Sequence, residues 1–473
     1  MDTSIMSTPL KVKNLKTVDF SIDQMCTLYF YGKRIFRAVN DEYISQVEDM
    51  FDCGLISELI EKELFVNTWI SDVEIEGYKL VIEHEYIEYW NYPYEWSFSM
   101  LHKAANVVLD ANEIAFKHGY EIFDSHAYNV VFMMNKPVYV DFGSFIKRDV
   151  RNQNSWSGFS NFYNSFYIPL FLYKKGYADV PNNIFLYNGF YNDKDLFNLR
   201  YRYAGLFGKS ISNLLYHIRF SKRRLASARY SRVIDKYGNH KHFEKLIRFK
   251  KAFQNNYSTK HARKLIGKID RSSFDSYWKD YHDDKDPKND KRFLRIKEIV
   301  TKHMADATSA VELASNQGKF ANFLINNTHL STMISTDYDK NALDQNFKVN
   351  GSQDNYLTLV HDFVRPNQRH NTSSFVDRIQ GDVVIALAVT HHLILTQDVS
   401  LDHIFDTLEN LSANYVIVEF MPLGLYFGDM NNIPKTPDYY SLEWFDSAFR
   451  ERFEYILDEE LAVNRHVFVG KCK

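Results

Sequence analysis

The chain has 473 residues, more than a single ordinary hydrophobic core holds, so two or three domains are expected. Its composition (45% hydrophobic, 25% charged) is that of a soluble globular protein, and a formal net charge of −3 argues against nucleic-acid binding by the chain as a whole. Three cysteines without metal-ligand spacing, no signal-like apolar segment at the N-terminus and no apolar run of about 18 residues predict a cytoplasmic protein without a transmembrane segment.

The first 145 residues alternate short β-rich segments with helices. Strands are expected within residues 18–38, where Gly32 suits a hairpin turn, and within Val73–Trp90. Helical patterns cover Asp41–Glu63 and Trp96–His118, and two short strands, NVVFM and PVYVDF, follow them. This order predicts an α+β domain with a small sheet and a helical part.

Residues 155–285 are expected to be mainly helical, and they become strongly basic. Between Tyr201 and Asp270 there are 18 Lys and Arg residues against 3 Asp and Glu residues. Such a segment can face an anionic partner, such as a membrane lipid, a phosphorylated glycan or a nucleic acid, or it can be a solvated helical face. The charged run HDDKDPKNDKR over His282–Arg292 predicts a domain boundary.

Helices and strands alternate from Arg292 to the C-terminus, which predicts a parallel α/β sheet. Polar residues stand at the carboxyl ends of the expected strands, the edge where ligands bind in open α/β sheets. In chain order these strands are Ser309–Leu313 before the turn to Gly318, THLSTMISTDYD ending in Asp337 and Asp339, NYLTLVHDF ending at Asp362, GDVVIALAVTHHL ending at His391 and His392, and NYVIVEFMP ending at Glu419.

This order resembles that of the class I S-adenosylmethionine-dependent methyltransferases, which have a Rossmann-like α/β fold. Their first motif, an acidic residue followed by two glycines, reads here ELASNQG from Glu312 to Gly318. Ala314 replaces the first glycine, and the turn tolerates its methyl group if the φ angle of Ala314 stays negative. Asp337 follows Gly318 by 19 residues, the spacing of an acidic residue that binds ribose hydroxyls.

The resemblance implies S-adenosylmethionine as the cofactor. It places Glu312, Ala314 and Gly318 along the methionine part, with Asn316 in the same turn, Asp337 at the ribose and Asp362 near the adenine. Methyl transfer needs chiefly an acceptor held in line with the activated methyl group. If the acceptor is a sugar hydroxyl, a base assists, and the candidate catalytic residues are His391, His392 and Glu419.

A second group of motifs lies in the N-terminal half. The spacing of Asp124, His126 and Asn129, followed by the Asp-Phe-Gly sequence that begins at Asp141, resembles the catalytic and metal-binding loops of protein-kinase-like folds. The histidine makes it most similar to small-molecule kinases of the aminoglycoside-phosphotransferase type. The resemblance implies Asp124 as the catalytic carboxylate, Asn129 and Asp141 as Mg²⁺ ligands, and ATP as a possible second cofactor.

The phosphate-binding part of this motif set departs from the kinase pattern. No glycine-rich loop is present, and the first strands carry only Gly32. Arg37 stands where the ATP-binding lysine is expected, with Lys33 as the alternative, and arginine does not replace lysine equivalently. An acidic partner is expected from the following helix, from Glu48, Glu58 or Glu61.

The combination predicts a kinase-like domain over 1–230, a basic helical connector over 231–284 and a methyltransferase domain over 285–473. With NYPYEWSFSMLHKAA and SYWKDYHDDKDPKNDKRFLRI, it resembles the NoeA-like group of bacterial polysaccharide-modifying methyltransferases and, in content, the WbdD-like kinase–methyltransferases. The resemblance implies methylation of a saccharide or glycan precursor, with a kinase activity in the stronger form. The alternatives are an RNA or protein methyltransferase that uses the basic 201–270 segment, and a scaffold with an inert kinase-like fold.

Overall fold

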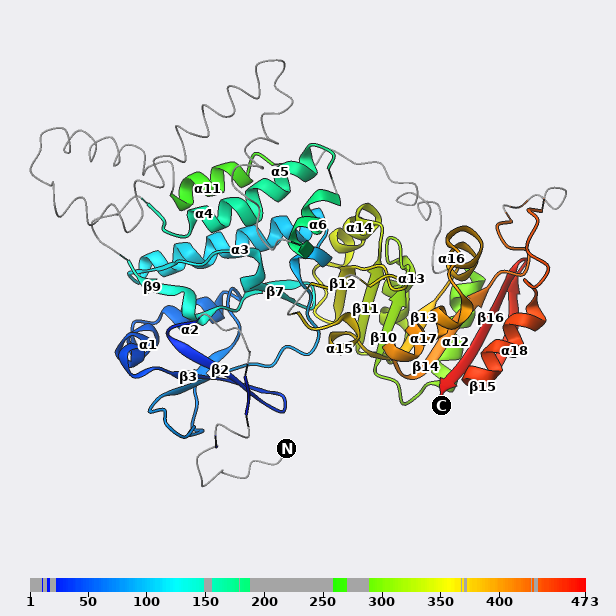
Figure 1. Ribbon diagram of the computed structural model, residues 1–473, viewed down its shortest axis with the longest axis horizontal. Coiled ribbons are helices and arrows are strands. Elements are labelled where there is room, and N and C mark those ends of the chain that lie inside the picture. The colour runs from blue at the N-terminus through cyan, green and yellow to red at the C-terminus, as the bar shows by residue number, and fades with distance from the viewer. Residues whose placement is uncertain are drawn as a thin grey trace, which may run out of the picture. The chain divides into compact units, whose positions relative to one another are not determined.

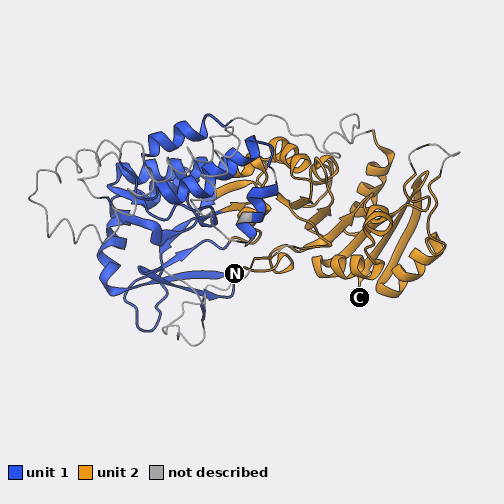
Figure 2. Ribbon diagram, turned by 45° about the horizontal axis from the view of Figure 1, so that its top comes forward, with its two compact units in different colours: residues 1–86, 102–130, 138–271 blue, residues 87–101, 131–137, 272–473 orange. Residues whose placement is uncertain are grey.

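The computed structural model describes residues 11, 15–17, 23–148, 155–177, 179–187, 258–269, 289–366, 368–369, 372–426, 428 and 433–473. The chain divides into two compact units (Figure 2). Unit 1 comprises residues 1–86, 102–130 and 138–271, and unit 2 comprises residues 87–101, 131–137 and 272–473. The boundaries expected at 230/231 and 284/285 lie outside the described residues.

Unit 1 begins with a five-stranded antiparallel sheet in the order β1-β2-β3-β5-β4 (Figure 1). Its strands are β1 (Lys16–Thr17), β2 (Cys26–Tyr31), β3 (Arg34–Val39), β4 (Thr68–Ile70) and β5 (Val81–His84), and η2 (Asp41–Tyr43), α1 (Ile44–Asp52) and α2 (Leu55–Glu61) lie between β3 and β4. Gly32 makes the expected hairpin turn with a φ of +58°. The strand expected to begin at Val73 forms earlier, at Thr68, because Val73 and Ile75 pack against one core cluster of the sheet instead.

Helices dominate the rest of unit 1. The elements that follow are α3 (Phe98–Lys117), β6 (Tyr120–Ile122), η4 (Ala127–Asn129), β7 (Val130–Met133), β8 (Lys136–Tyr139), η5 (Phe142–Ser144), β9 (Phe145–Lys147), α4 (Phe159–Phe162), the π-helical turn η7 (Tyr163–Tyr167), α5 (Ile168–Lys174), α6 (Asp179–Tyr187) and α11 (Thr259–Ile266). The spacing of Ala104, Val108, Ala111 and Ala115, all fully buried, shows why α3 forms an amphipathic helix. No helix in the described part of the chain has the length and apolar character needed to cross a membrane.

Unit 2 contains a seven-stranded sheet in the order β12-β11-β10-β13-β14-β16-β15 (Figure 1). Its strands are β10 (Ser309–Leu313), β11 (Thr332–Asp337), β12 (Tyr356–Val360), β13 (Gly381–Ala386), β14 (Ser412–Phe420), β15 (Phe453–Ala462) and β16 (Arg465–Cys472). Its helices are α12 (Lys291–His303), α13 (Lys319–Asn327), α14 (Lys340–Asn350), α15 (Phe375–Arg378), α16 (Thr390–Gln397), α17 (Leu401–Leu411) and α18 (Leu442–Arg452). Strands β10 to β14 are parallel as predicted, but β16 runs antiparallel to both neighbours, so the sheet is mixed.

Two segments from the N-terminal half complete unit 2. Asn135, from segment 131–137, accepts hydrogen bonds from the backbone N–H and the hydroxyl of Thr358 (both 3.0 Å), and its amide donates to the carbonyl of Asn350 (3.1 Å). These bonds occupy β12, which lies at the edge of the sheet. An uncovered edge strand would present unpaired backbone groups to other chains, and Asn135 satisfies part of this one.

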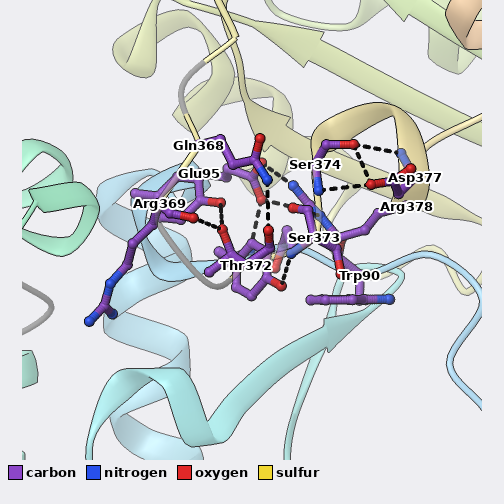
Figure 3. Close-up of polar contacts among 12 residues, drawn as sticks. Trp90, Glu95, Gln368, Arg369, Thr372, Ser373, Ser374, Asp377 and Arg378 are labelled. Atoms are coloured by element: carbon purple, nitrogen blue, oxygen red, sulfur yellow. Dashed lines mark hydrogen bonds and ion pairs between the residues drawn. The ribbon is translucent and has the colours of Figure 1, made fainter. Parts of the chain in front are cut away.

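A buried ion pair fixes the other segment, residues 87–101, and Figure 3 shows its surroundings. The guanidinium of Arg378 donates to both carboxylate oxygens of Glu95 (2.6 and 3.1 Å) and to the carbonyl of Trp90 (2.7 Å). It also faces the Tyr92 ring, 4.6 Å from the centroid. Both charged side chains are 2% exposed, so this pair anchors the segment to α15 inside unit 2.

Candidate active site

The carboxyl ends of β10 and β13 lie side by side in the sheet, although β11 and β12 separate these strands in the sequence. This is the switch point of the strand order, where open α/β sheets bind ligands. A cavity of about 30 Å³ opens there, lined by α12, α13, the loops after β10 and β13, and Arg465 at the start of β16. That volume suits a small polar group such as a carboxylate or an amino group, because about 10–15 Å³ already holds one water molecule.

The turn after β10 adopts a left-handed backbone. Ala314 and Asn316 both have a φ of +53°, and Gly318 has a φ of +66°. The condition under which the turn accepts the Ala314 methyl group without strain, a negative φ, is therefore not met. An alanine in this region costs about 1 kcal/mol because its Cβ crowds the following carbonyl oxygen. Ala388, after β13, also has a φ of +53°, so two strained alanines line the same cavity, as is typical of functional sites.

Gly318 has a packing role in addition to its turn. A Cβ atom on Gly318 would collide with the side-chain amide of Asn346, and that buried amide donates a hydrogen bond to the Ser335 hydroxyl (2.7 Å). Gly318 is also the N-cap residue of α13. Its predicted contact with a cofactor stays a prediction.

The side chain of Glu312 lies inside the site and has little access to water. It is 5% exposed, and one carboxylate oxygen accepts a hydrogen bond from the backbone N–H of Ala321 (3.0 Å). Burial raises the pKa of Glu312 to about 8, and the Asp337 carboxylate contributes to the rise, while the Ala321 hydrogen bond and Arg292 oppose it. A cationic group bound beside it would favour the ionised form.

Asp337 lies at the end of β11, at the turn formed by residues 314–318. Its two oxygens accept hydrogen bonds from the backbone N–H groups of Asn316 and Asp339, each at 2.7 Å. Burial raises its pKa to about 7 in spite of these bonds. The carboxylate keeps acceptor capacity that a hydroxyl can donate to. The next residue, Tyr338, is 55% exposed and was not among the site residues predicted from the sequence. Its position directly after Asp337 was a signal that could have identified it.

Asp362 follows the neighbouring strand β12, whose loop is tied to the Asp337 carbonyl by the backbone N–H of His361 (2.9 Å). The Asp362 carboxylate accepts from the backbone N–H groups of Val364 and Arg365, both at 3.2 Å, and so shapes its own loop. The strand ends therefore bring Asp337 and Asp362 to adjacent loops as predicted. An adenine contact for Asp362 stays a prediction.

Glu419 is fully buried at the end of β14, between two arginines. Arg465 donates to one of its oxygens at 2.8 Å, and the nearest approach of Arg292 is 3.3 Å. These contacts hold both guanidinium groups at the cavity wall. The carboxylate is thereby engaged in positioning the arginines, and a role for Glu419 as a base stays a prediction.

His391 and His392 lie in the first turn of α16 rather than at the end of a strand, because β13 ends at Ala386. His391 is 5% exposed, and its Nδ1 atom has no hydrogen-bond partner among the described residues. Burial lowers the pKa of His391 to about 3, with His392 and Arg465 adding to the effect, and burial also lowers the pKa of His392. Both rings are therefore neutral at physiological pH, and the low pKa makes His391 a weak base.

Unit 1 brings its predicted residues together in a second site. The amide of Asn129 donates to the Asp141 carboxylate (3.2 Å) and to the Asp124 carbonyl (2.7 Å), and Arg37 lies 3.6 Å from Asp141. The Asp124 carboxylate accepts from Asn161 (2.9 Å). Within the described ranges, no cluster of three or more His, Cys, Asp or Glu side chains is arranged to hold a metal ion, so Asn129 and Asp141 as Mg²⁺ ligands stay predictions.

The acidic partner of Arg37 differs from the expected one. Glu58 instead contacts Lys117 (3.0 Å) and His118 (2.7 Å). Arg37 pairs with the Asp23 carboxylate at 2.5 Å. The expectation that Arg37 pairs with an acidic residue of the following helix is therefore wrong. Asp23 lies just before β2 and accepts a hydrogen bond from the backbone N–H of Met25, and β2 pairs with the strand that carries Arg37.

Little of the basic 201–270 segment falls among the described residues. In residues 258–269, the guanidinium of Arg263 is engaged by Asp110 (2.6 Å) and Glu113 (2.8 Å) of α3. Residues 201–257 and residue 270 lie outside the described part of the chain. An anionic partner for this segment stays a prediction.

The chain shows similarity to a curated protein and to several solved structures. No protein-family model matches the chain. Nodulation protein NoeA of Rhizobium meliloti (strain 1021) is 27% identical over 362 residues, which cover 72% of this chain and 71% of NoeA. Solved structures with similarity include N-methyltransferase NodS from Bradyrhizobium japonicum WM9 in complex with S-adenosyl-L-homocysteine (10% identity, TM-score 0.30, 41% of this chain and 90% of NodS) and the PH0226 protein from Pyrococcus horikoshii OT3 (17%, 0.33, 42% and 100%).

The assignment of the fold rests on the sheet itself. Five parallel strands with β10 beside β13, and an antiparallel β16 between β14 and β15, form the sheet of the class I methyltransferases resembled by the sequence. Unit 2 therefore has a Rossmann-like α/β fold with the strand order that this resemblance implies.

Proposed function

We propose that the chain is an S-adenosylmethionine-dependent methyltransferase that modifies a hydroxyl or phosphate oxygen of a saccharide or glycan precursor. The observation that carries the methyltransferase half is the convergence of the 314–318 turn, Asp337 and the cavity on the switch point of the sheet. The saccharide half is supported by the resemblance to glycan-modifying methyltransferases and by the similarity to a nodulation protein.

The residues of the site fit this cofactor. The cavity has room for its amino-acid end, with Arg292 placed for the carboxylate and Glu312 for the amino group. The spare acceptor capacity of Asp337 suits ribose hydroxyls, and Asp362 and Tyr338 stand on the adjacent loops. When bound, S-adenosylmethionine supplies an activated methyl group. The chain then has to hold the acceptor in line, and neutral His391 or His392 can take the proton of a hydroxyl.

The experiment is a calorimetric titration of S-adenosylmethionine, followed by transfer of a labelled methyl group to glycan, RNA and protein fractions. Binding that is lost in Asp337→Ala, and label in the glycan fraction, would support the proposal. Label in RNA instead, with activity that falls steeply as salt rises, would favour the alternative in which the basic segment binds an anionic polymer.

We also propose that unit 1 has a kinase-like fold with a nucleotide site. The carrying observation is that Arg37, on β3 of the five-stranded antiparallel sheet, lies 3.6 Å from Asp141, which also accepts a hydrogen bond from Asn129, as the motif resemblance implies. If Mg²⁺ and ATP bind, Asn129 and Asp141 are the residues that would hold the metal. Titration of Mg·ATP into the wild type and Asp141→Asn, together with the Asp23 variants described below, tests this proposal.

A further inference from the structure

The proposed nucleotide site of unit 1 already contains an internal anion. We propose that the carboxylate of Asp23 takes the position of a nucleotide phosphate and blocks Mg·ATP from binding to the chain in this conformation. The inference rests on the proposed kinase-like fold, because that resemblance identifies Arg37 as the phosphate-binding cation and Asp141 as the metal-binding carboxylate.

Asp23 is held by the kinds of groups that bind phosphate. One oxygen accepts hydrogen bonds from the backbone N–H groups of Met25 (2.9 Å) and Cys26 (3.2 Å). The other accepts from the guanidinium of Arg37 (2.5 Å). Successive backbone N–H groups together with an arginine are the donors that proteins commonly use for a phosphate oxygen. Asp23 occupies all three.

The carboxylate also fills the space beside the Asp-Phe-Gly motif. A Cβ atom built on Gly143 would lie 2.5 Å from one Asp23 oxygen and 2.7 Å from the other, so only glycine leaves room for it. The side chains of Asp23 and Arg37 are 12% and 10% exposed. A ligand oxygen that bonds to the Nη1 group of Arg37 must therefore displace Asp23, which already accepts from that group.

The charges at the site oppose an added polyphosphate. Arg37 lies between two carboxylates, 2.5 Å from Asp23 and 3.6 Å from Asp141. Burial raises the pKa of Asp141, and the carboxylates of Asp23 and Asp124 contribute to the rise, while Arg37 and Ser144 oppose it. One guanidinium thus serves several acidic groups. A nucleotide phosphate placed beside Asp23 would meet a like charge that replacement by asparagine removes.

The test compares Mg·ATP binding by calorimetry in the full-length wild type, Asp23→Asn, Asp141→Asn and the double variant. Asparagine keeps an oxygen for the two backbone N–H groups and removes the charge. Asp41→Asn is the matched control. Asp41 is 64% exposed and pairs with Lys79, so this substitution removes the same charge from the surface of unit 1. Thermal unfolding of each variant, with Asp23→Ser as a second replacement, shows that the fold is retained.

We expect no saturable binding by the wild type or Asp41→Asn, an association constant at least about tenfold higher in Asp23→Asn and Asp23→Ser, and loss of that binding in the double variant. Wild-type binding as tight as in the Asp23 variants, and lost in Asp141→Asn, would overturn the inference and leave the nucleotide site standing. If folded wild type and Asp23 variants all fail to bind, the nucleotide site itself is refuted.

Discussion

The raised pKa of Glu312 makes cofactor binding depend on pH in a way that a single substitution can isolate. The apoprotein holds this proton up to about pH 8, whereas an unperturbed glutamate loses it near 4.5. The ammonium and sulfonium groups of S-adenosylmethionine favour the carboxylate form, so we expect binding to release the proton. Glu312→Gln keeps the shape of the side chain and cannot ionise.

The magnitude follows from the ionised fraction. With a pKa of about 8, Glu312 is about 3% ionised at pH 6.5 and about three-quarters ionised at pH 8.5, so its contribution raises the association constant roughly 20-fold over that range. Asp337, with a pKa of about 7, adds roughly a further fourfold in both proteins. The α-amino group of the cofactor also titrates near this range. Only the difference between wild type and Glu312→Gln reports Glu312.

The assay is calorimetry at pH 6.5, 7.5 and 8.5, in two buffers with different ionisation enthalpies. We expect the wild type to release close to one more proton than Glu312→Gln at pH 6.5 and to show the steeper rise in affinity. The contribution of Glu312 to folding stability changes with pH in the opposite direction to its contribution to cofactor affinity. Because the folded pKa lies above the unfolded one, the contribution of Glu312 to the stability of the apoprotein is fully present below about pH 4.5 and is lost as pH rises to about 8. Equal pH profiles for wild type and Glu312→Gln would refute the reasoning.

Three further predictions concern stability and the proton acceptor. Ala314→Gly relieves a left-handed backbone, so the free energy of unfolding should change little or rise by up to about 1 kcal/mol, measured in urea, whereas Ala314→Val should destabilise the protein. Arg378→Ala leaves Glu95 buried without its partner and should cost about 3–5 kcal/mol, and restoration of stability by the single variant Arg378→Lys would contradict the bidentate pairing. If the acceptor is a hydroxyl, His391→Ala should lower kcat about 100-fold or more and leave the cofactor Kd unchanged, while a weakened Kd would instead show that the ring supports the cofactor loop.

The sequence was informative where local pattern and fold agree. Each of the strands β10, β11 and β12 is a mostly buried run with an acidic residue at or just after its end. This pattern made the positions of Glu312, Asp337 and Asp362 predictable. The error at His391 has a physical cause. The run VVIALAV is apolar throughout and cannot be divided by periodicity, and the bend that ends the strand uses Ala388, which gives no turn signal.

Other features depend on contacts between residues distant in sequence. Strand β15 (Phe453–Ala462) is exposed or half-buried along most of its length, so it shows no buried strand pattern. The Asp23–Arg37 pair joins two residues 14 positions apart without any motif around Asp23. The inclusion of 87–101 and 131–137 in unit 2 depends on Glu95 and Asn135 finding partners more than 200 residues away. No local pattern encodes such pairings.

These long-range contacts also show how segments of the N-terminal half serve unit 2. Glu95 neutralises a buried arginine of unit 2, and Asn135 satisfies the edge of its sheet, so the N-terminal half supplies groups without which unit 2 would hold an unpaired charge and an open strand. Both segments lie within the stretch that connects the elements of unit 1 in the sequence. Segments 87–101 and 131–137 therefore have a structural purpose in unit 2 whether or not unit 1 binds a nucleotide. A block of the proposed phosphate position in unit 1 by Asp23 is compatible with the proposed methyltransferase activity of unit 2, and the two properties can be tested separately.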